Sequence, residues 1–254
     1  MPSLKIRETT LAYDDVGPRD APDTIVLLHG FSSNRNENWR RVGWLGAFER
    51  RRVRAIAFDL PGHGESDKPH DPAAYRIDVL TADIAAALDA LDVPTATLMG
   101  YSMGARLALA VALARPERFD RLILGGVGGK IFDAPPGNPM AEAMEAANVD
   151  AISDPLLKSF RMFAEEQGED RQALAAFARA RSDGGYDRDE LARLRLPTLV
   201  VAGARDTLAG SPDDLAAEFP SGRSVTLPGC DHFSAIAHAL FKAAVFDFLE
   251  ETAT

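Results

Sequence analysis

Residues 100–104 read Gly-Tyr-Ser-Met-Gly, and the rest of the chain is best interpreted outward from this stretch. An apolar run precedes it at residues 96–99, and a run of helix-forming residues follows at 105–113. A serine between two glycines at a strand-to-helix turn is typical of a nucleophile elbow. In so sharp a turn the backbone approaches itself closely, and only glycine fits on either side of the serine. The turn would expose the Ser102 hydroxyl near the N–H groups that begin the helix.

Strand-like and helix-like segments alternate along most of the chain. Largely apolar runs predict strands that are covered on both faces, at residues 24–28, 53–58, 96–99, 121–124 and 198–202. Residues 39–52 and 75–91 predict helices between them, and Ser234 can cap a final helix. This alternation predicts an α/β protein with a mostly parallel, doubly wound sheet.

The segment between residues 125 and 195 differs from the rest. Glycine- and proline-rich stretches are followed by amphipathic runs without a buried-strand pattern, at residues 139–148, 155–167 and 171–182. We interpret residues 128–194 as a small helical insertion on a core made of residues 1–127 and 195–254. Met140 and Phe160 are candidates to line a pocket beneath it, although such apolar residues can equally serve only to pack the insertion onto the core.

Composition and charge narrow the classes of function. With 254 residues, 46% of them hydrophobic, the chain can form a large core, and bulk disorder is not expected. The net charge of −10 argues against nucleic acid and anionic membrane surfaces as partners. It also fits poorly with a polyanionic substrate, unless a local basic pocket overrides it. Cys230 is the single cysteine, which excludes an intramolecular disulfide.

Several familiar signals do not occur in the sequence. We find neither a secretory signal nor an apolar run long enough for a membrane span, so we expect a cytoplasmic protein, as a monomer or homodimer. No group of His, Cys, Asp and Glu residues has the spacing of metal ligands. No glycine-rich nucleotide motif occurs. We therefore expect neither a metal nor a cofactor.

Three polar residues each follow a predicted strand, in the order Ser102, Asp206 and His232. The carboxyl ends of parallel strands meet at one edge of a sheet, so the three side chains can gather there. A serine hydroxyl is too weakly acidic to react alone, so His232 would take its proton. Asp206 would then hold the histidine tautomer and stabilise its charged form. Asp133 is the alternative acid, because it lies in the loop after the preceding predicted strand.

The chain resembles proteins of the α/β-hydrolase fold over nearly its whole length. The matching pieces are residues 29–31 (His-Gly-Phe), 59–66, 100–104, 203–206 and 231–233 (Asp-His-Phe). The order serine, acid, histidine is also that of the family. The insertion matches the family's cap by position and not by motif. The resemblance implies a serine hydrolase whose oxyanion hole is made by the backbone N–H groups of Phe31 and Met103. Asp231 is a departure, because the family more often has glycine there.

The elbow residue separates branches of the resembled family. Haloalkane dehalogenases and epoxide hydrolases of this fold have aspartate at the elbow, so Ser102 favours hydrolysis of a small carboxylic ester, lactone or related acyl compound, as in a carboxylesterase. An alternative is a cofactor-free lyase or a C–C bond hydrolase. Tyr101 and Arg106 resemble residues of the menaquinone-pathway synthase branch, where Arg106 could bind a substrate carboxylate. A non-catalytic ligand receptor is a third option, and the intact triad argues against it.

Overall fold

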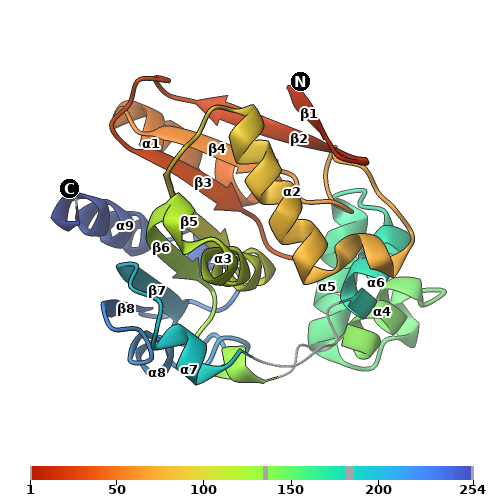
Figure 1. Ribbon diagram of the computed structural model, residues 1–254. Helices are drawn as coiled ribbons and strands as arrows, with labels where there is room; N and C mark the ends of the chain where they lie inside the picture. The colour runs from red at the N-terminus through yellow and green to blue at the C-terminus, as the bar shows by residue number, and fades with distance from the viewer. Residues whose placement is uncertain (1, 134–136, 181–185, 253–254) are drawn as a thin grey trace.

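One mixed sheet forms the centre of the molecule in the computed structural model, which describes residues 2–133, 137–180 and 186–252. Its eight strands lie in the order β1-β2-β4-β3-β5-β6-β7-β8 (Figure 1). The first two strands run antiparallel to their neighbours, and the other pairs are parallel. The strands are β1 (Ser3–Ile6), β2 (Thr9–Val16), β3 (Thr24–Leu28), β4 (Arg54–Phe58), β5 (Ala96–Tyr101), β6 (Phe119–Gly125), β7 (Thr198–Gly203) and β8 (Gly222–Leu227).

Helices cover both faces of this sheet, which explains the largely apolar runs in its central strands. On one face α2 (Ile77–Ala90) and α3 (Met103–Ala114) pack over a large apolar core, and on the other α1 (Trp44–Arg50) and α9 (Ala239–Glu251) do the same. Figure 1 shows α2 and α3 in front of the sheet. The predicted α/β fold with a mostly parallel, doubly wound sheet is confirmed. No helix within the described ranges combines the length and the apolar character needed to cross a membrane.

Two predicted helices begin differently from expectation. Residues 39–52 do not form one helix: the π-helical turn η1 (Asn36–Arg40) and α1 are separated by Gly43, whose φ of 81° breaks the helical path. Ser234 does not cap the last helix. His238 does so, because its side chain accepts a hydrogen bond from the Leu240 N–H. In both cases the residues favour a helix, and the local backbone geometry decides where the helix starts.

Helices α4 (Gly137–Glu145), α5 (Pro155–Glu166), α6 (Arg171–Ala180) and α7 (Arg188–Leu191) connect β6 to β7. The first three enclose an apolar cluster of their own, which packs against Phe31 and Leu208, residues that follow β3 and β7. In Figure 1 they form a group at one side of the sheet. Residues 181 and 182, the predicted end of the third helical run, lie outside the described part of the chain. The division into core and insertion at residues 128–194 stays a prediction.

Candidate active site

Ser102 lies at a tight turn between the end of β5 and the start of α3. Its backbone has φ 55° and ψ −113°, a strained conformation for a residue with a side chain. A Cβ atom added at Gly100 would lie 2.1 Å from the carbonyl oxygen of Gly104, and one added at Gly104 would lie 2.1 Å from that of Leu28. Both glycines are therefore required by close backbone approach, as the motif indicates.

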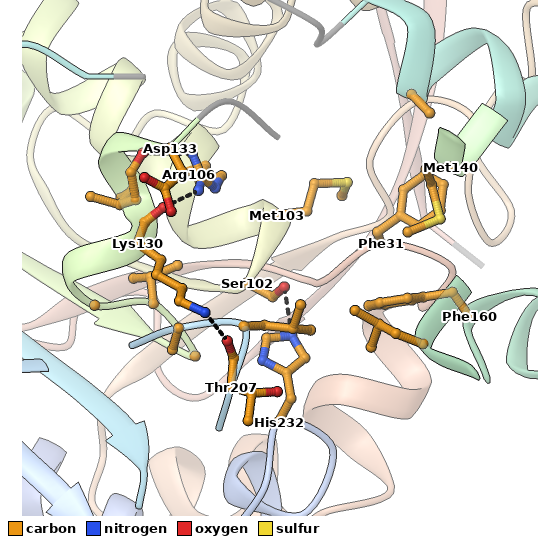
Figure 2. A pocket seen from close by; sticks show the side chains of 18 of the residues that line it. Phe31, Ser102, Met103, Arg106, Lys130, Asp133, Met140, Phe160, Thr207 and His232 are labelled. Atoms are coloured by element: carbon orange, nitrogen blue, oxygen red, sulfur yellow. Dashed lines mark hydrogen bonds between the residues drawn. The ribbon is translucent and has the colours of Figure 1, made fainter. Parts of the chain in front are cut away.

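Hydrogen bonds connect the three polar residues that follow strands. Ser102 Oγ lies 2.8 Å from His232 Nε2 (Figure 2). His232 Nδ1 lies 2.8 Å from Asp206 Oδ2. The second oxygen of Asp206 accepts hydrogen bonds from two backbone N–H groups in its own loop, those of Leu208 and Ala209. A carboxylate only accepts, so Nδ1 carries the imidazole proton and Nε2 is left to accept from the serine.

The two other acids considered near the histidine have different positions. Asp133 is exposed and makes no recorded contact with His232, so Asp206 is the acid that the structure brings to the ring. Asp231 accepts hydrogen bonds from the Ser234 hydroxyl and from the N–H groups of Phe233 and Ser234. These bonds, chiefly that from the hydroxyl, hold the pKa of Asp231 below its usual value. Asp231 thus shapes the turn around His232.

The two predicted oxyanion donors belong to residues that line the same cavity as the serine. Met103 is the first residue of α3, so its N–H has no acceptor within the helix. Phe31 lies in a turn whose backbone is fixed by a hydrogen bond from the Gly30 N–H to Asn38 Oδ1, at 2.7 Å. His29 supports the same turn, because its Nε2 accepts from the Leu60 N–H at 2.9 Å. Burial lowers the pKa of His29 and favours the neutral ring that this acceptor role requires.

The loop at residues 59–66 supports the site without reaching the serine. The Asp59 carboxylate is paired with the Arg35 guanidinium and also accepts from the N–H groups of Arg35 and Glu65. His63 is fully buried, and its ring packs edge-on against Phe31 and Phe177. Burial, with a smaller contribution from His29, lowers the pKa of His63 well below its usual value.

A cavity of about 280 Å³ opens next to Ser102. Its labelled lining residues fall into two groups in Figure 2: Phe31, Met140 and Phe160 lie on one side of Ser102, and the charged residues lie on the other. Among the described residues that line the cavity, Arg106, Lys130 and Asp133 are the charged ones. Met140 belongs to α4 and Phe160 to α5, so the helices between β6 and β7 supply part of the apolar wall.

A second cavity, of about 460 Å³, is also lined by Ser102. Both cavities are lined by Phe31, Ser102, Phe160 and His232. The second also has walls from α5 and from the turn after β3. Ser102 therefore lies where the linings of the two cavities overlap.

Tyr101 and Arg106, which are predicted to bind substrate, also hold neighbouring loops in place. Tyr101 is almost completely buried, and its hydroxyl donates to the carbonyl oxygen of His232 at 2.5 Å. The Arg106 guanidinium donates to the carbonyl oxygens of Ile131 (2.9 Å) and Lys130 (3.1 Å). Each residue lines a cavity, but the recorded bonds of its polar group are to the backbone of neighbouring loops.

Glu169, between α5 and α6, is a buried acid that the sequence pattern does not reveal. Its carboxylate accepts from Asn34 Nδ2 at 3.0 Å and from the Gly64 N–H at 2.8 Å. Burial raises its pKa. These bonds join the helical segment to the loops after β3 and β4. The sequence contains no local signal for this role, because the partners Asn34 and Gly64 are distant from Glu169 in the chain.

Metal-binding clusters are not found in the part of the chain that the structure describes: no three His, Cys, Asp or Glu residues there are grouped to hold an ion.

Comparison with known proteins agrees with this geometry. Residues 23–150 match the family model of the alpha/beta hydrolase fold. The chain is 32% identical to 2-hydroxymuconate semialdehyde hydrolase of Pseudomonas sp. (strain CF600), over 89% of this chain and 87% of that protein. It is 35% identical to the dihydrolipoyllysine-residue acetyltransferase component of the acetoin cleaving system of Pseudomonas putida, over 82% of this chain but only 58% of that protein.

Among solved structures, the enol-lactonase of Burkholderia xenovorans LB400 is similar with a TM-score of 0.81 and 26% identity, covering 98% of this chain and 100% of that one. The matching family model, the similar relatives and the shared fold lead to one conclusion. The chain belongs to the α/β-hydrolase fold family and is a hydrolase.

Proposed function

We propose that this chain is a serine hydrolase that cleaves a small carboxylic ester, lactone or related acyl compound through an acyl-enzyme on Ser102. The observation that carries the proposal is the continuous hydrogen-bonded series from Ser102 through His232 to Asp206, with both links at 2.8 Å. A nucleophile needs a base within hydrogen-bond reach, and the base needs a group that orients it. The three residues meet both requirements.

In the first half of the reaction, Ser102 Oγ attacks the carbonyl carbon while its proton moves to His232 Nε2. Asp206 accepts the hydrogen bond from Nδ1–H and stabilises the imidazolium. The proton on Nε2 then passes to the leaving oxygen as the bond from the acyl carbon to that oxygen breaks. In the second half a water molecule loses its proton to Nε2 and attacks the acyl carbon, which releases the acid and restores the serine hydroxyl.

The negative charge on the carbonyl oxygen needs donors in place before the reaction. We assign this role to the backbone N–H groups of Phe31 and Met103, residues that line the same cavity as Ser102. One such donor typically lowers the barrier by about 3–4 kcal/mol. The strained elbow and the buried bond between Gly30 and Asn38 keep both donors from moving away when the site is empty.

The volume of the cavity beside Ser102 supports a small substrate. At about 280 Å³ it is comparable to the smallest ligand pockets, and the second cavity, of about 460 Å³, adds further room next to Ser102. We propose that the helices between β6 and β7 act as a cap, because Met140 and Phe160 form part of its wall. The similarity to an enol-lactonase supports lactones within the proposed class.

A second candidate is hydrolysis of a C–C bond with the same three residues. It is favoured by the similarity to 2-hydroxymuconate semialdehyde hydrolase, because the named substrate contains no ester. Disappearance of such a conjugated semialdehyde, followed by its ultraviolet absorbance, without turnover of any ester would establish this candidate in place of the first.

The deciding experiment is labelling with a fluorophosphonate probe together with turnover of short p-nitrophenyl esters. The wild-type protein should be labelled and active, Ser102→Ala should be neither, and Ser3→Ala on β1 should match the wild type. Folded wild-type protein that is not labelled and turns over no ester would contradict the proposal. Ligand binding without turnover would instead indicate a receptor.

A further inference from the structure

The cavity beside Ser102 is apolar on one side and charged on the other. Phe31, Met140 and Phe160 form the apolar side, and Lys130 projects from the opposite side toward Ser102 and His232 (Figure 2). An uncharged acyl substrate would gain nothing from a cation in this place. Such a substrate would also displace water from the Lys130 ammonium without replacing the hydrogen bonds that the water accepts, which is unfavourable.

Lys130 keeps hydrogen-bonding capacity for a ligand. Its ammonium donates to the carbonyl oxygen of Thr207 at 2.8 Å. An ammonium group has three donors, and no other acceptor or carboxylate partner is recorded for it among the described residues. Thr207 directly follows Asp206, so this bond anchors the cation to the same loop that carries the acid of the proposed triad.

The backbone of Lys130 is held in place on both sides. Its N–H donates to the carbonyl oxygen of Ala209, and its own carbonyl oxygen accepts from the Arg106 guanidinium. Arg106 therefore supports the turn η4 (Gly129–Phe132) that presents Lys130. The fixed turn and the bond to Thr207 hold the Lys130 ammonium beside the cavity, where its exposed side chain can bind an anion.

Among the described residues that line this cavity, Asp133 is the acidic residue, and Arg106 and Lys130 are the basic residues. The formal sum of Arg106, Lys130 and Asp133 is thus +1, in a protein whose overall charge is −10. The carboxylates of Asp206, which pairs with His232, and of Asp214, which lies against Gly129, are also close to this side of the cavity. The remaining donors of the Lys130 ammonium can therefore serve one carboxylate of a ligand, whereas several negative charges would be repelled by these acids.

We propose that the substrate is an acyl compound with one carboxylate at the end of its acyl chain, and that Lys130 binds this carboxylate. The inference rests on the proposed function, because Ser102 must hold the acyl carbon for the distance to the cation to matter. Lys130 is then a specificity-determining residue, and the apolar side of the cavity accommodates the uncharged part of the substrate.

Two p-nitrophenyl esters of equal shape test the proposal: the hemiglutarate, which carries a terminal carboxylate, and the 5-methylhexanoate, in which two methyl groups replace its oxygens. After subtraction of spontaneous hydrolysis, the quantity compared is the ratio of kcat/KM for the charged ester to that for the neutral one. We expect a ratio above one for the wild type and a fall of about 10- to 100-fold in Lys130→Met, mainly through KM.

Three further variants make the test specific. Lys130→Arg should keep most of the ratio, Asp133→Asn should raise it several-fold, and Lys5→Met on β1, which removes the same charge far from the site, should leave it unchanged. A loosened Thr207 loop would slow both esters equally, so the ratio separates charge recognition from a structural effect.

The outcomes also separate this inference from the function on which it rests. Turnover of both esters with the same ratio in Lys130→Met and wild type would overturn the role of Lys130 and leave the hydrolase proposal intact. A wild-type preference for the neutral ester would do the same. Absence of turnover for both esters, without fluorophosphonate labelling, would instead contradict the proposed function itself.

Discussion

The two walls of the site are held in different ways. The wall that carries Ser102, Asp206 and His232 is made of turns at strand ends, and main-chain contacts position it, such as the 2.8 Å bond from the Ser102 N–H to the Gly125 carbonyl oxygen. The wall made by α4 to α6 is positioned by side chains: aromatic contacts of Phe160 with Phe31 and His232, and the carboxylate of Glu169.

This difference indicates that the two walls have different roles, one in the proposed chemistry and the other in the shape of the cavity. Backbone contacts leave little freedom, so the proposed chemistry is carried by the wall that tolerates the least change. Side-chain contacts can be exchanged one at a time, so the shape of the cavity can vary while the sheet stays the same. Substitutions in the two walls should therefore have effects of different kind and size.

The largest expected effect is on the sheet wall, in Asp206→Asn. The shape is kept, but the amide favours the wrong histidine tautomer, so kcat for a neutral ester should fall by about 10⁴-fold. The same change at Asp133 should lower it by less than tenfold. Steady-state kinetics of both variants measure this, and a larger loss at Asp133 would reverse the assignment of the acid.

The next largest effect is expected on the free energy of unfolding, when one glycine from each wall is replaced. Gly104→Ala places a Cβ atom 2.1 Å from the Leu28 carbonyl oxygen, and we expect the free energy of unfolding to fall by about 3 kcal/mol. Gly168→Ala, after α5, meets nothing within 4 Å, and only its φ of +67° opposes the substitution, at about 1 kcal/mol. Denaturant unfolding of both variants is the measurement. Equal losses would show that the two walls are equally constrained.

A smaller effect is expected where the walls are joined, in Glu169→Ala. The Gly64 N–H and the Asn34 amide lose their acceptor, and the free energy of unfolding should fall by about 1–3 kcal/mol. Because Asn34 lies in the same loop as Phe31, kcat for a neutral ester should fall as well. Glu142→Ala, an exposed acid on α4, is the control. Unchanged stability in Glu169→Ala would mean that aromatic contacts alone hold the helices.

The smallest effect is expected at His63, whose buried ring packs against Phe31 and Phe177. His63 has a pKa below 6.5 in the folded protein, so the unfolded chain takes up the proton first. Its stabilising contribution is therefore complete above pH 6.5 and is lost as the pH falls. Between pH 6.5 and 5.5, wild-type stability should decrease by up to about 1 kcal/mol more than that of His63→Phe. Denaturant titrations at the two pH values measure the difference, and parallel curves would contradict it.

Much of the sheet wall could be predicted because its signals are local. The run at residues 24–28 coincides with β3, and Gly100 and Gly104 are where a Cβ atom cannot fit. The start of α9 was misplaced, because Ser234 and His238 are both able to cap a helix and only the surrounding backbone selects one. Tyr101 and Arg106 are predicted to bind substrate, and the structure adds that their polar groups donate to the carbonyl oxygens of His232 and Ile131, which are distant in sequence.

By itself the sequence determined the α/β fold, the elbow around Ser102 and the order in which the other polar residues follow their strands. These features depend on steric limits within a few residues and on the apolar pattern of each strand. Only the tertiary structure decided that Asp206 and not Asp133 meets His232, that Glu169 joins the two walls, and that Lys130 faces the cavity. Such pairings depend on which loops the sheet brings together, and the side chains involved are separated in the chain by up to 135 residues.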